Sequence, residues 1–345
     1  MKERNQAQML VNGFMSTAII YTACELNLFD LIKDRKMSLE EIAGTLNVRQ
    51  DYIARIVRPL VQYKLISFQD GKYTSTIMGS FFSDDTKGSV KDYALFCGRE
   101  SIHVWMKMYE SIIRNRPPME ILGEDGLFDD MENDSERFST FNKMMSSVSE
   151  QLNLQPLFKK LESESAELKI VDVGGGTGTI IKKFLNYYPG STGTILDLKQ
   201  AQEAAIKSLS DDKLSDRCVF TEADFFKPLL VSGDIFVLSR VLHDWDNGKS
   251  ELILKNVASA MNNESKLVII DEIIFSPDNP MSLKGFICDI QMWVFCDGKE
   301  RSREEFTELL SKSGLRLCEC INIDNGTCAL ICQKDSKEEY EQGEI

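Results

Sequence analysis

The chain has 345 residues, of which 43% are apolar and 27% are charged, and its formal net charge is −14. This length provides one large domain or two ordinary ones, and the composition is that of a globular protein. No apolar run approaches the roughly 18 residues of a membrane-spanning helix. Met1 to Leu10 lacks the apolar segment of a signal peptide, so we expect a cytoplasmic protein. The negative charge argues against a chain that mainly coats nucleic acid.

The nine cysteines include no Cys-x-x-Cys pair. Cys318, Cys320, Cys328 and Cys332 could be metal ligands, but the alternating residues around them favour two strands instead. We therefore expect reduced thiols and no metal site.

The first 95 residues predict a winged helix. Helical spacing from Gln8 to Leu31 is followed by a capping box, Ser38-Leu39-Glu40-Glu41, and by a second helical stretch from Asp51 to Tyr63. Residues 65–76 then read as a β-hairpin. Winged helices often bind DNA, but residues 1–95 hold 12 basic and 11 acidic side chains, a balance of only +1. The alternative is that this module packs against a second subunit.

Residues 96–165 predict a helical connector that is interrupted at Pro117-Pro118. An aromatic and methionine stripe within it includes Met145. Such a stripe is usually core, but methionines also suit the wall of a pocket for a flat ligand.

An apolar run at Ile170 to Val173 ends in the glycine-rich turn Gly174 to Gly178, and a helical stretch follows. Glycines in such a unit let backbone N–H groups approach a nucleotide-like ligand closely, although a plain loop would show the same pattern. Strands and helices then alternate as far as Asp271, which predicts a doubly wound parallel sheet. A C-terminal hairpin around Asn325-Gly326 closes it, as in class I methyltransferases rather than dehydrogenases.

Acidic side chains follow the second and third predicted strands of this sheet. The Asp197 carboxylate could accept both ribose hydroxyls of an adenosine, and Asp224 could accept from the adenine amino group while Phe225 covers the ring. Each acid alone could equally be a helix cap. Their position at successive strand ends favours a ligand site.

The chain has two histidines, and an imidazole is the natural base for a hydroxyl near neutral pH. His103 lies in a predicted helix beside Trp105, where we expect a packed core or pocket-wall histidine. His243 follows the carboxyl end of a predicted strand, where sites form in parallel sheets. His243 is therefore the candidate base, and a loop histidine without a role is the alternative.

The order of these motifs resembles that of the small-molecule O-methyltransferases over nearly the whole chain. The matching segments are Val171 to Gly178, Asp197-Leu198, Ala223-Asp224-Phe225-Phe226, Val241-Leu242-His243-Asp244-Trp245 and Gly298-Lys299-Glu300-Arg301. The resemblance implies that a winged-helix dimerisation domain precedes a methyltransferase domain. It also implies that S-adenosylmethionine is the cofactor and that a glutamate orients a histidine base.

In this resemblance His243 matches the base, Glu300 matches the orienting glutamate, and a further acid falls on Asp271 or Glu272. The cofactor-binding candidates are Asp172, Gly174, Gly176, Asp197, Leu198, Asp224, Phe225, Ser239 and Arg240. The acceptor-site candidates are Met145, Asp244, Met292 and Trp293. The chain departs from the plant members at Lys199 and Ser239, where they usually have a proline and a lysine.

We therefore expect an α/β protein with a Rossmann-like class I methyltransferase sheet and an N-terminal all-α winged-helix dimerisation domain. The expected domains are residues 1–95, 96–165 and 166–334, followed by an acidic tail at 335–345. The expected activity is S-adenosylmethionine-dependent methylation of a hydroxyl of a small aromatic molecule, by a homodimer without nucleic-acid or membrane partners. The alternatives are C- or N-methylation, a non-methylating reaction on the same fold, and a DNA-binding regulator that senses S-adenosylmethionine.

Overall fold

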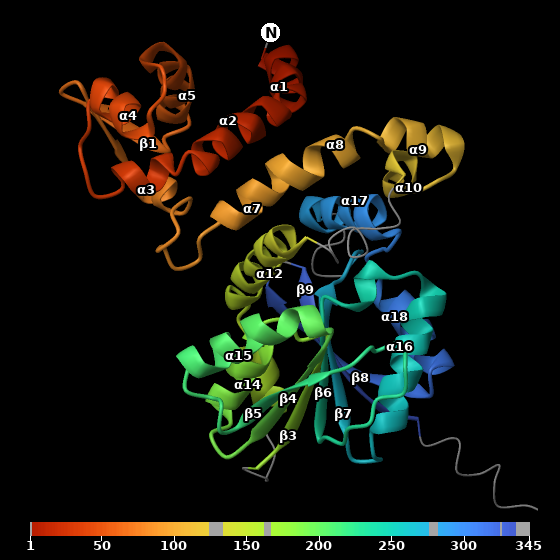
Figure 1. Ribbon diagram of the computed structural model, residues 1–345. Helices are drawn as coiled ribbons and strands as arrows, with labels where there is room; N and C mark the ends of the chain where they lie inside the picture. Colours follow the sequence, from red (N-terminus) through yellow and green to blue (C-terminus); the bar gives the residue numbers. More distant parts are fainter. Residues whose placement is uncertain (1, 124–133, 162–166, 276–281, 325, 336–345) are drawn as a thin grey trace, which may run out of the picture. The chain divides into compact units, whose positions relative to one another are not determined.

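A computed structural model describes residues 2–123, 134–161, 167–275, 282–324 and 326–335 (Figure 1). Contacts divide the chain into two compact units, Met1–Lys107 with Asp134–Val148 and Met108–Asn133 with Ser149–Ile345. The turn residue Asn325 and the acidic tail beyond Asp335 lie outside the described residues. Within the described ranges, no helix is long and apolar enough to cross a bilayer.

The N-terminal unit begins with five helices, α1 (Lys2–Val11), α2 (Gly13–Glu25), α3 (Leu28–Ile32), α4 (Leu39–Leu46) and α5 (Gln50–Gln62). The predicted capping box starts α4: Ser38 Oγ accepts from Glu41 N–H, and the Glu41 carboxylate accepts from Ser38 N–H. Apolar faces of α2 to α5 converge on a fully buried core that includes Phe29, Val57 and Leu60.

The predicted hairpin follows as the antiparallel strands β1 (Ile66–Gln69) and β2 (Lys72–Ser75). The unit continues with α6 (Ile77–Ser80), α7 (Lys91–Phe96), the π-helix η1 (Cys97–Ser101), α8 (Ile102–Trp105) and most of α12 (Ser135–Glu150), where Met145 is half-buried. His103 on α8 is exposed, so the expectation of a packed core histidine is wrong, and a pocket-wall histidine stays a prediction. The reason is that Val104, which is 2% exposed, takes the inward position of that turn.

A buried lysine anchors the start of α7. Lys91 Nζ lies 2.7 Å from Asp30 Oδ2 and 2.7 Å from Asp84 Oδ2, and it donates to Asn27 Oδ1 at 2.6 Å. Only 5% of the Lys91 side chain is exposed. These three acceptors replace water around the ammonium group, as a buried charge requires.

The second unit is built on a seven-stranded sheet with the strand order β5-β4-β3-β6-β7-β9-β8. The strands are β3 (Lys169–Val173), β4 (Thr192–Asp197), β5 (Cys218–Glu222), β6 (Ile235–Ser239), β7 (Lys266–Glu272), β8 (Leu315–Asp324) and β9 (Thr327–Lys334). Among these described strands, β9 runs antiparallel to both of its neighbours, β7 and β8, and the other pairings are parallel. The chain reverses its direction of winding between β3 and β6, which is where ligands bind in such sheets.

Helices cover both faces of this sheet (Figure 1). α13 (Gln155–Lys160), α14 (Thr179–Tyr187) and α15 (Gln202–Asp211) share one hydrophobic cluster with the sheet, and α16 (Asn247–Ala260) and α18 (Arg303–Lys312) share the other. The unit also contains α9 (Met108–Arg114), α10 (Pro118–Leu122), the 3₁₀ turns η2 (Lys199–Ala201) and η3 (Leu242–Asp244), and α17 (Leu283–Cys296).

Candidate active site

A buried carboxylate supports the glycine-rich turn from below. Asp172 is 1% exposed at the end of β3, and its Oδ2 accepts from Ile181 N–H at 3.2 Å. A Cβ at Gly175 would lie 2.8 Å from the Asp172 carboxyl carbon, so the turn packs directly on this side chain. Burial raises the pKa of Asp172 to about 7. Asp172 therefore shapes the turn through its backbone contacts.

The turn itself has three glycines with positive φ, Gly174, Gly176 and Gly178. Gly174 and Gly176 have φ of +72° and +54°, and a Cβ at Gly174 would lie 2.8 Å from Val241 Cγ2. Gly176 N–H donates to Asp197 Oδ2 at 2.7 Å, and Leu198 N–H donates to Asp197 Oδ1 at 2.7 Å. Burial raises the pKa of Asp197, and these two donors act in the opposite direction. The carboxylate is thereby fixed at the carboxyl edge of β4.

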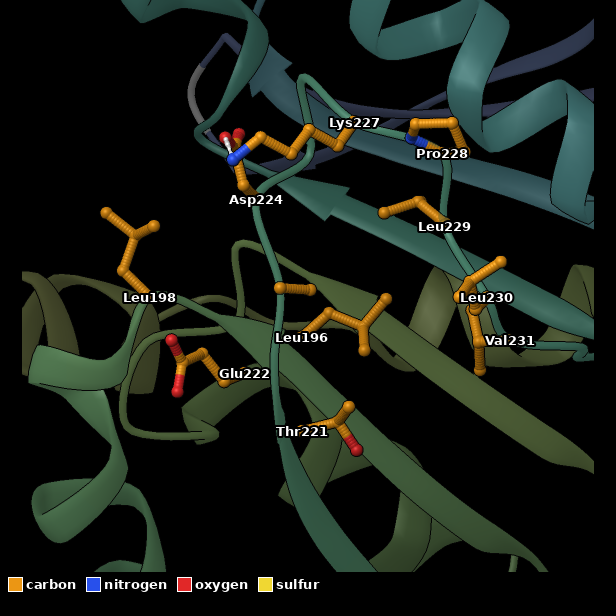
Figure 2. A pocket seen from close by; sticks show the side chains of 11 residues that line it. Leu196, Leu198, Thr221, Glu222, Asp224, Lys227, Pro228, Leu229, Leu230 and Val231 are labelled. Carbon is orange, nitrogen blue, oxygen red and sulfur yellow. Dashed lines mark ion pairs between the residues drawn. The ribbon is translucent and has the colours of Figure 1, made fainter.

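Asp224 and Leu198 line a cavity of about 660 Å³ beside the ends of β4 and β5 (Figure 2). Phe226 N–H donates to Asp224 Oδ1 at 2.9 Å, and Lys227 Nζ lies 3.1 Å from Asp224 Oδ2. The Phe225 ring lies 3.6 Å from the point that a Cβ at Gly174 would occupy. A glycine-rich turn, an aromatic ring and two hydrogen-bonded carboxylates lie at or just after the carboxyl ends of β3, β4 and β5, and this set of groups suits an adenosine.

The second cluster gathers around His243, which lies in η3 after β6 and is 4% exposed. Its Nδ1 lies 2.9 Å from Glu300 Oε1 and 3.8 Å from Asp271 Oδ1, and its Nε2 lies 3.6 Å from Asp244 Oδ1. Because an ionised carboxylate only accepts hydrogen bonds, the proton of the imidazole belongs on Nδ1. The Nε2 atom is then the position that can accept a proton.

The electrostatics of this cluster favour a charged imidazole. Burial lowers the pKa of His243, but the charges of Glu300, Asp244 and Asp271 outweigh it and raise the pKa to about 10. Burial raises the pKa of Asp271 to about 7 and that of Asp244 to about 6. Both oxygens of Asp271, and Oε2 of Glu300, have no hydrogen-bond partner within the described residues.

The two acids at the end of β7 have different surroundings. Asp271 is fully buried and belongs to the His243 cluster. Glu272 Oε2 accepts from Thr327 Oγ1 at 3.0 Å and lies 3.1 Å from Lys284 Nζ, in a separate group of contacts. The geometry thus separates two residues that the sequence leaves equivalent.

Contacts of residues 298–300 with the His243 turn and with α17 hold this cluster together. A Cβ at Gly298 would lie 2.1 Å from the His243 carbonyl oxygen, and Lys299 N–H donates to the same oxygen at 2.9 Å. Glu300 N–H donates to Asp289 Oδ1 on α17 at 2.9 Å. Sequence reasoning assigned no role to Gly298 or Arg301, although both belong to the Gly-Lys-Glu-Arg motif.

The remaining candidates lie around these clusters. Ser239 ends β6, and its buried Oγ has no partner within the described residues. Arg240 follows with φ of +55°, and its N–H donates to Ile270 O at 2.9 Å. Met292 and Trp293 are half-buried on α17. Met145 belongs to the other unit. No group of three or more His, Cys, Asp and Glu in the described part of the chain could hold a metal ion.

Comparison with known families and proteins connects these clusters to an activity. The family profile of the O-methyltransferase domain matches residues 105–316, and that of the O-methyltransferase dimerisation domain matches residues 8–85. The phenazine O-methyltransferase PhzM of Lysobacter antibioticus is 25% identical over 309 residues, which is 89% of each chain. The phenazine-1-carboxylate N-methyltransferase of Pseudomonas aeruginosa is 25% identical over 332 residues, 96% of this chain and 97% of that one.

A solved structure extends the likeness. The O-methyltransferase NcsB1 from neocarzinostatin biosynthesis, in complex with S-adenosylmethionine and 2-hydroxy-5-methyl naphthoic acid, is 25% identical with a TM-score of 0.78, covering 93% of this chain and 96% of that one. These matches confirm the predicted class I methyltransferase fold with its N-terminal dimerisation domain. The chain therefore belongs to the O-methyltransferase family, and its cofactor is S-adenosylmethionine.

Proposed function

We propose that this enzyme moves the methyl group of S-adenosylmethionine to a hydroxyl of a small aromatic molecule, with His243 as the general base. The observation that carries the proposal is the 2.9 Å contact between His243 Nδ1 and Glu300 Oε1, in a buried cluster at the carboxyl edge of the sheet. Glu300 fixes the tautomer and the ring orientation, and Nε2 faces the acceptor hydroxyl.

When bound, the cofactor supplies an electrophilic methyl group on a sulfonium cation. His243 takes the proton that the acceptor oxygen must lose. A phenol has a pKa of about 10, and the carboxylates around His243 bring its pKa to about 10 as well. The neutral imidazole is then a strong enough base to take the proton of a phenol onto Nε2, whereas the charged form, which the carboxylates favour at neutral pH, cannot take it.

We assign cofactor binding to the first cluster. Asp197 accepts the ribose hydroxyls, while Leu198, Asp224 and Phe225 bind the adenine, and Gly174 and Gly176 keep the turn free of side chains. The fixed carboxylate of Asp197 and the cavity beside Leu198 and Asp224 support this assignment. Ser239 and Arg240 follow at the carboxyl end of β6, between the cofactor residues and His243 in the sequence, and we assign them to the cofactor as well.

We assign the acceptor to the side of His243 that faces Asp244, with Met292 and Trp293 as candidate walls and Asp271 as the second acid. The named relatives support an aromatic acceptor, because their printed substrates are phenazines and a naphthoic acid. The dimerisation profile supports a homodimer. N-methylation is the second candidate, since one relative is named an N-methyltransferase.

Calorimetric titration with S-adenosylmethionine and S-adenosylhomocysteine tests the cofactor site. Losing a carboxylate that accepts charged hydrogen bonds costs about 1.5 to 3 kcal/mol, so Asp197→Ala should weaken binding about 10- to 100-fold. Asp216→Ala, an exposed acid two positions before β5, is the matched control. No binding by the wild-type protein would overturn the cofactor site.

A panel of phenols and aromatic amines then tests the acceptor and the base. His243→Ala should lower the rate about 10² to 10⁴-fold at unchanged cofactor affinity. Methylation of amines but not of phenols would replace the hydroxyl acceptor by the N-methylation alternative. Full activity of the variant would exclude His243 as the base.

A further inference from the structure

Arg301 is a fully buried arginine with an unusual set of partners. Among the described residues it is the largest fully buried side chain, at 0% exposure, and it forms no salt bridge with any of them. Its guanidinium donates instead to neutral oxygens: Leu242 O at 2.8 Å, Trp245 O at 2.8 Å, Asn247 Oδ1 at 3.1 Å and Ser250 Oγ at 3.0 Å. Burying a charge among neutral acceptors is expensive, and an apolar side chain would fill the same space more cheaply.

Two of these partners lie on either side of the proposed base, His243, in the sequence. Leu242 precedes His243, and Trp245 follows Asp244, so the two carbonyls that Arg301 binds lie at the two ends of η3. Ser250 Oγ lies 3.1 Å from Leu242 O and 3.2 Å from Trp245 O, so its single proton can be donated to either carbonyl, and it thereby joins the same network. The planar guanidinium can reach several fixed carbonyls at once, which a lysine ammonium on a flexible stem does not do.

The backbone of the same residue is attached to the sheet. Ile274 N–H donates to Arg301 O at 3.2 Å, and Ile273 forms a parallel bridge with Arg301 directly after β7. Glu300 is the preceding residue, so its main chain is fixed between Asp289 on one side and Arg301 on the other. Arg301 therefore fixes the position of the turn that carries His243 through its side chain, and that of the segment that carries Glu300 through its backbone.

We infer that Arg301 is the positioning residue of the His243–Glu300 pair, which holds Nδ1 and Oε1 at hydrogen-bond distance by fixing the two segments to each other. The catalytic consequence rests on the proposed function, whereas the positioning itself concerns two side chains that can be observed without any acceptor. The charged groups that face His243 are Glu300, Asp271 and Asp244, with Arg240 and Arg301 beside the acids.

Histidine imidazole NMR tests the inference directly, because the chain has only two histidines and only one of them is buried. With ¹⁵N-labelled histidine, His103→Gln assigns the exposed ring, and the remaining Nδ1–H signal reports the contact with Glu300. Arg301→Lys keeps the positive charge and removes the planar guanidinium with its several donors. The contact between His243 Nδ1 and Glu300 should then loosen, so this signal should shift upfield and the proton should exchange faster with water. Arg303→Lys, an exposed arginine on α18, should leave it unchanged.

A second variant guards against a folding defect. Asn247→Ala removes one acceptor of the Arg301 guanidinium at an exposed position, so it should move the same signal in the same direction by a smaller amount. Titration with S-adenosylhomocysteine should give the wild-type affinity in both variants, because Asp197 and Asp224, which are assigned to the adenosine, lie at the end of β4 and after β5 and do not contact Arg301. An unchanged Nδ1–H signal in a folded Arg301→Lys variant would overturn the inference.

Once an acceptor is known, kinetics supply the second readout. A misplacement of about 1 Å costs up to about 10²-fold in rate, so Arg301→Lys should lower kcat about 10- to 100-fold with KM values within a factor of about two. Equal losses in kcat and in cofactor affinity would show a general structural role and refute positioning. If no acceptor is methylated by the wild type, the NMR result still stands, and only the proposed function fails.

Discussion

Replacing Gly298 by alanine should disturb the catalytic turn by a single methyl group. The added Cβ would lie 2.1 Å from His243 O, 2.7 Å from Asp244 C and 2.9 Å from Asp244 O, all of them backbone atoms. Reaching an ordinary contact of 3.4 Å requires a movement of about 1.3 Å (3.4 − 2.1). Overpacking of this kind costs about 3 kcal/mol. A shift of about 1 Å at a catalytic group costs about 10²-fold in rate.

Urea unfolding and steady-state kinetics measure these two effects on the same samples. Gly44→Ala is the control, because a Cβ at that position in α4 meets no heavy atom within 4 Å. Alanine in a helix interior should stabilise the control by about 0.5 to 1 kcal/mol. A Gly298→Ala protein with wild-type stability and wild-type kcat would refute the argument that this close approach fixes His243.

Two further predictions concern buried charges. Burial raises the pKa of Asp172 to about 7 in the folded protein, against about 4 in the unfolded chain. The folded state then binds the extra proton, so this group's contribution to stability falls as the pH rises from 4 to 7. Asp172→Asn should reduce the loss in the free energy of unfolding between pH 4 and pH 7, measured by urea unfolding, by about 3 to 4 kcal/mol. An unchanged dependence on pH would contradict the raised pKa of Asp172. Lys91→Met should destabilise the N-terminal unit by about 1 to 3 kcal/mol, because it leaves Asp30 and Asn27 Oδ1 without their donor, whereas Asp84 is 73% exposed and stays hydrated. Lys87→Met, at an exposed lysine, should have no such effect, and equal stabilities in thermal unfolding would show that the buried group is not needed.

Much of the fold follows from local signals in the sequence. The glycine-rich turn, the capping box at Ser38 and the hairpin turn at Asp70-Gly71 each impose a backbone geometry that few residue types accept. α17 was not predicted, because Leu283–Cys296 is apolar nearly throughout and shows no helical period. His103 also differs from expectation, since a neighbouring tryptophan does not determine which face of a helix is buried.

Local sequence signals predict only part of the site. Strand ends pointed to Asp197, Asp224 and His243, because parallel strands bring their carboxyl ends to one edge. The choice between Asp271 and Glu272 depends on which face of β7 each side chain takes, and a shift of one residue exchanges the faces. The partners of Arg301 are 51 to 59 residues away in sequence, so no local pattern could connect them.

The contact between Gly174 and Val241 has a consequence for how such an enzyme can be altered. A Cβ on the glycine would lie 2.8 Å from Val241 Cγ2. The turn assigned to the methyl donor therefore packs directly against the segment that leads to the base. Bulk added on either side is transmitted to the other. In laboratory evolution toward new acceptors, Gly174 should therefore be kept, and Val241 should be exchanged only for smaller side chains.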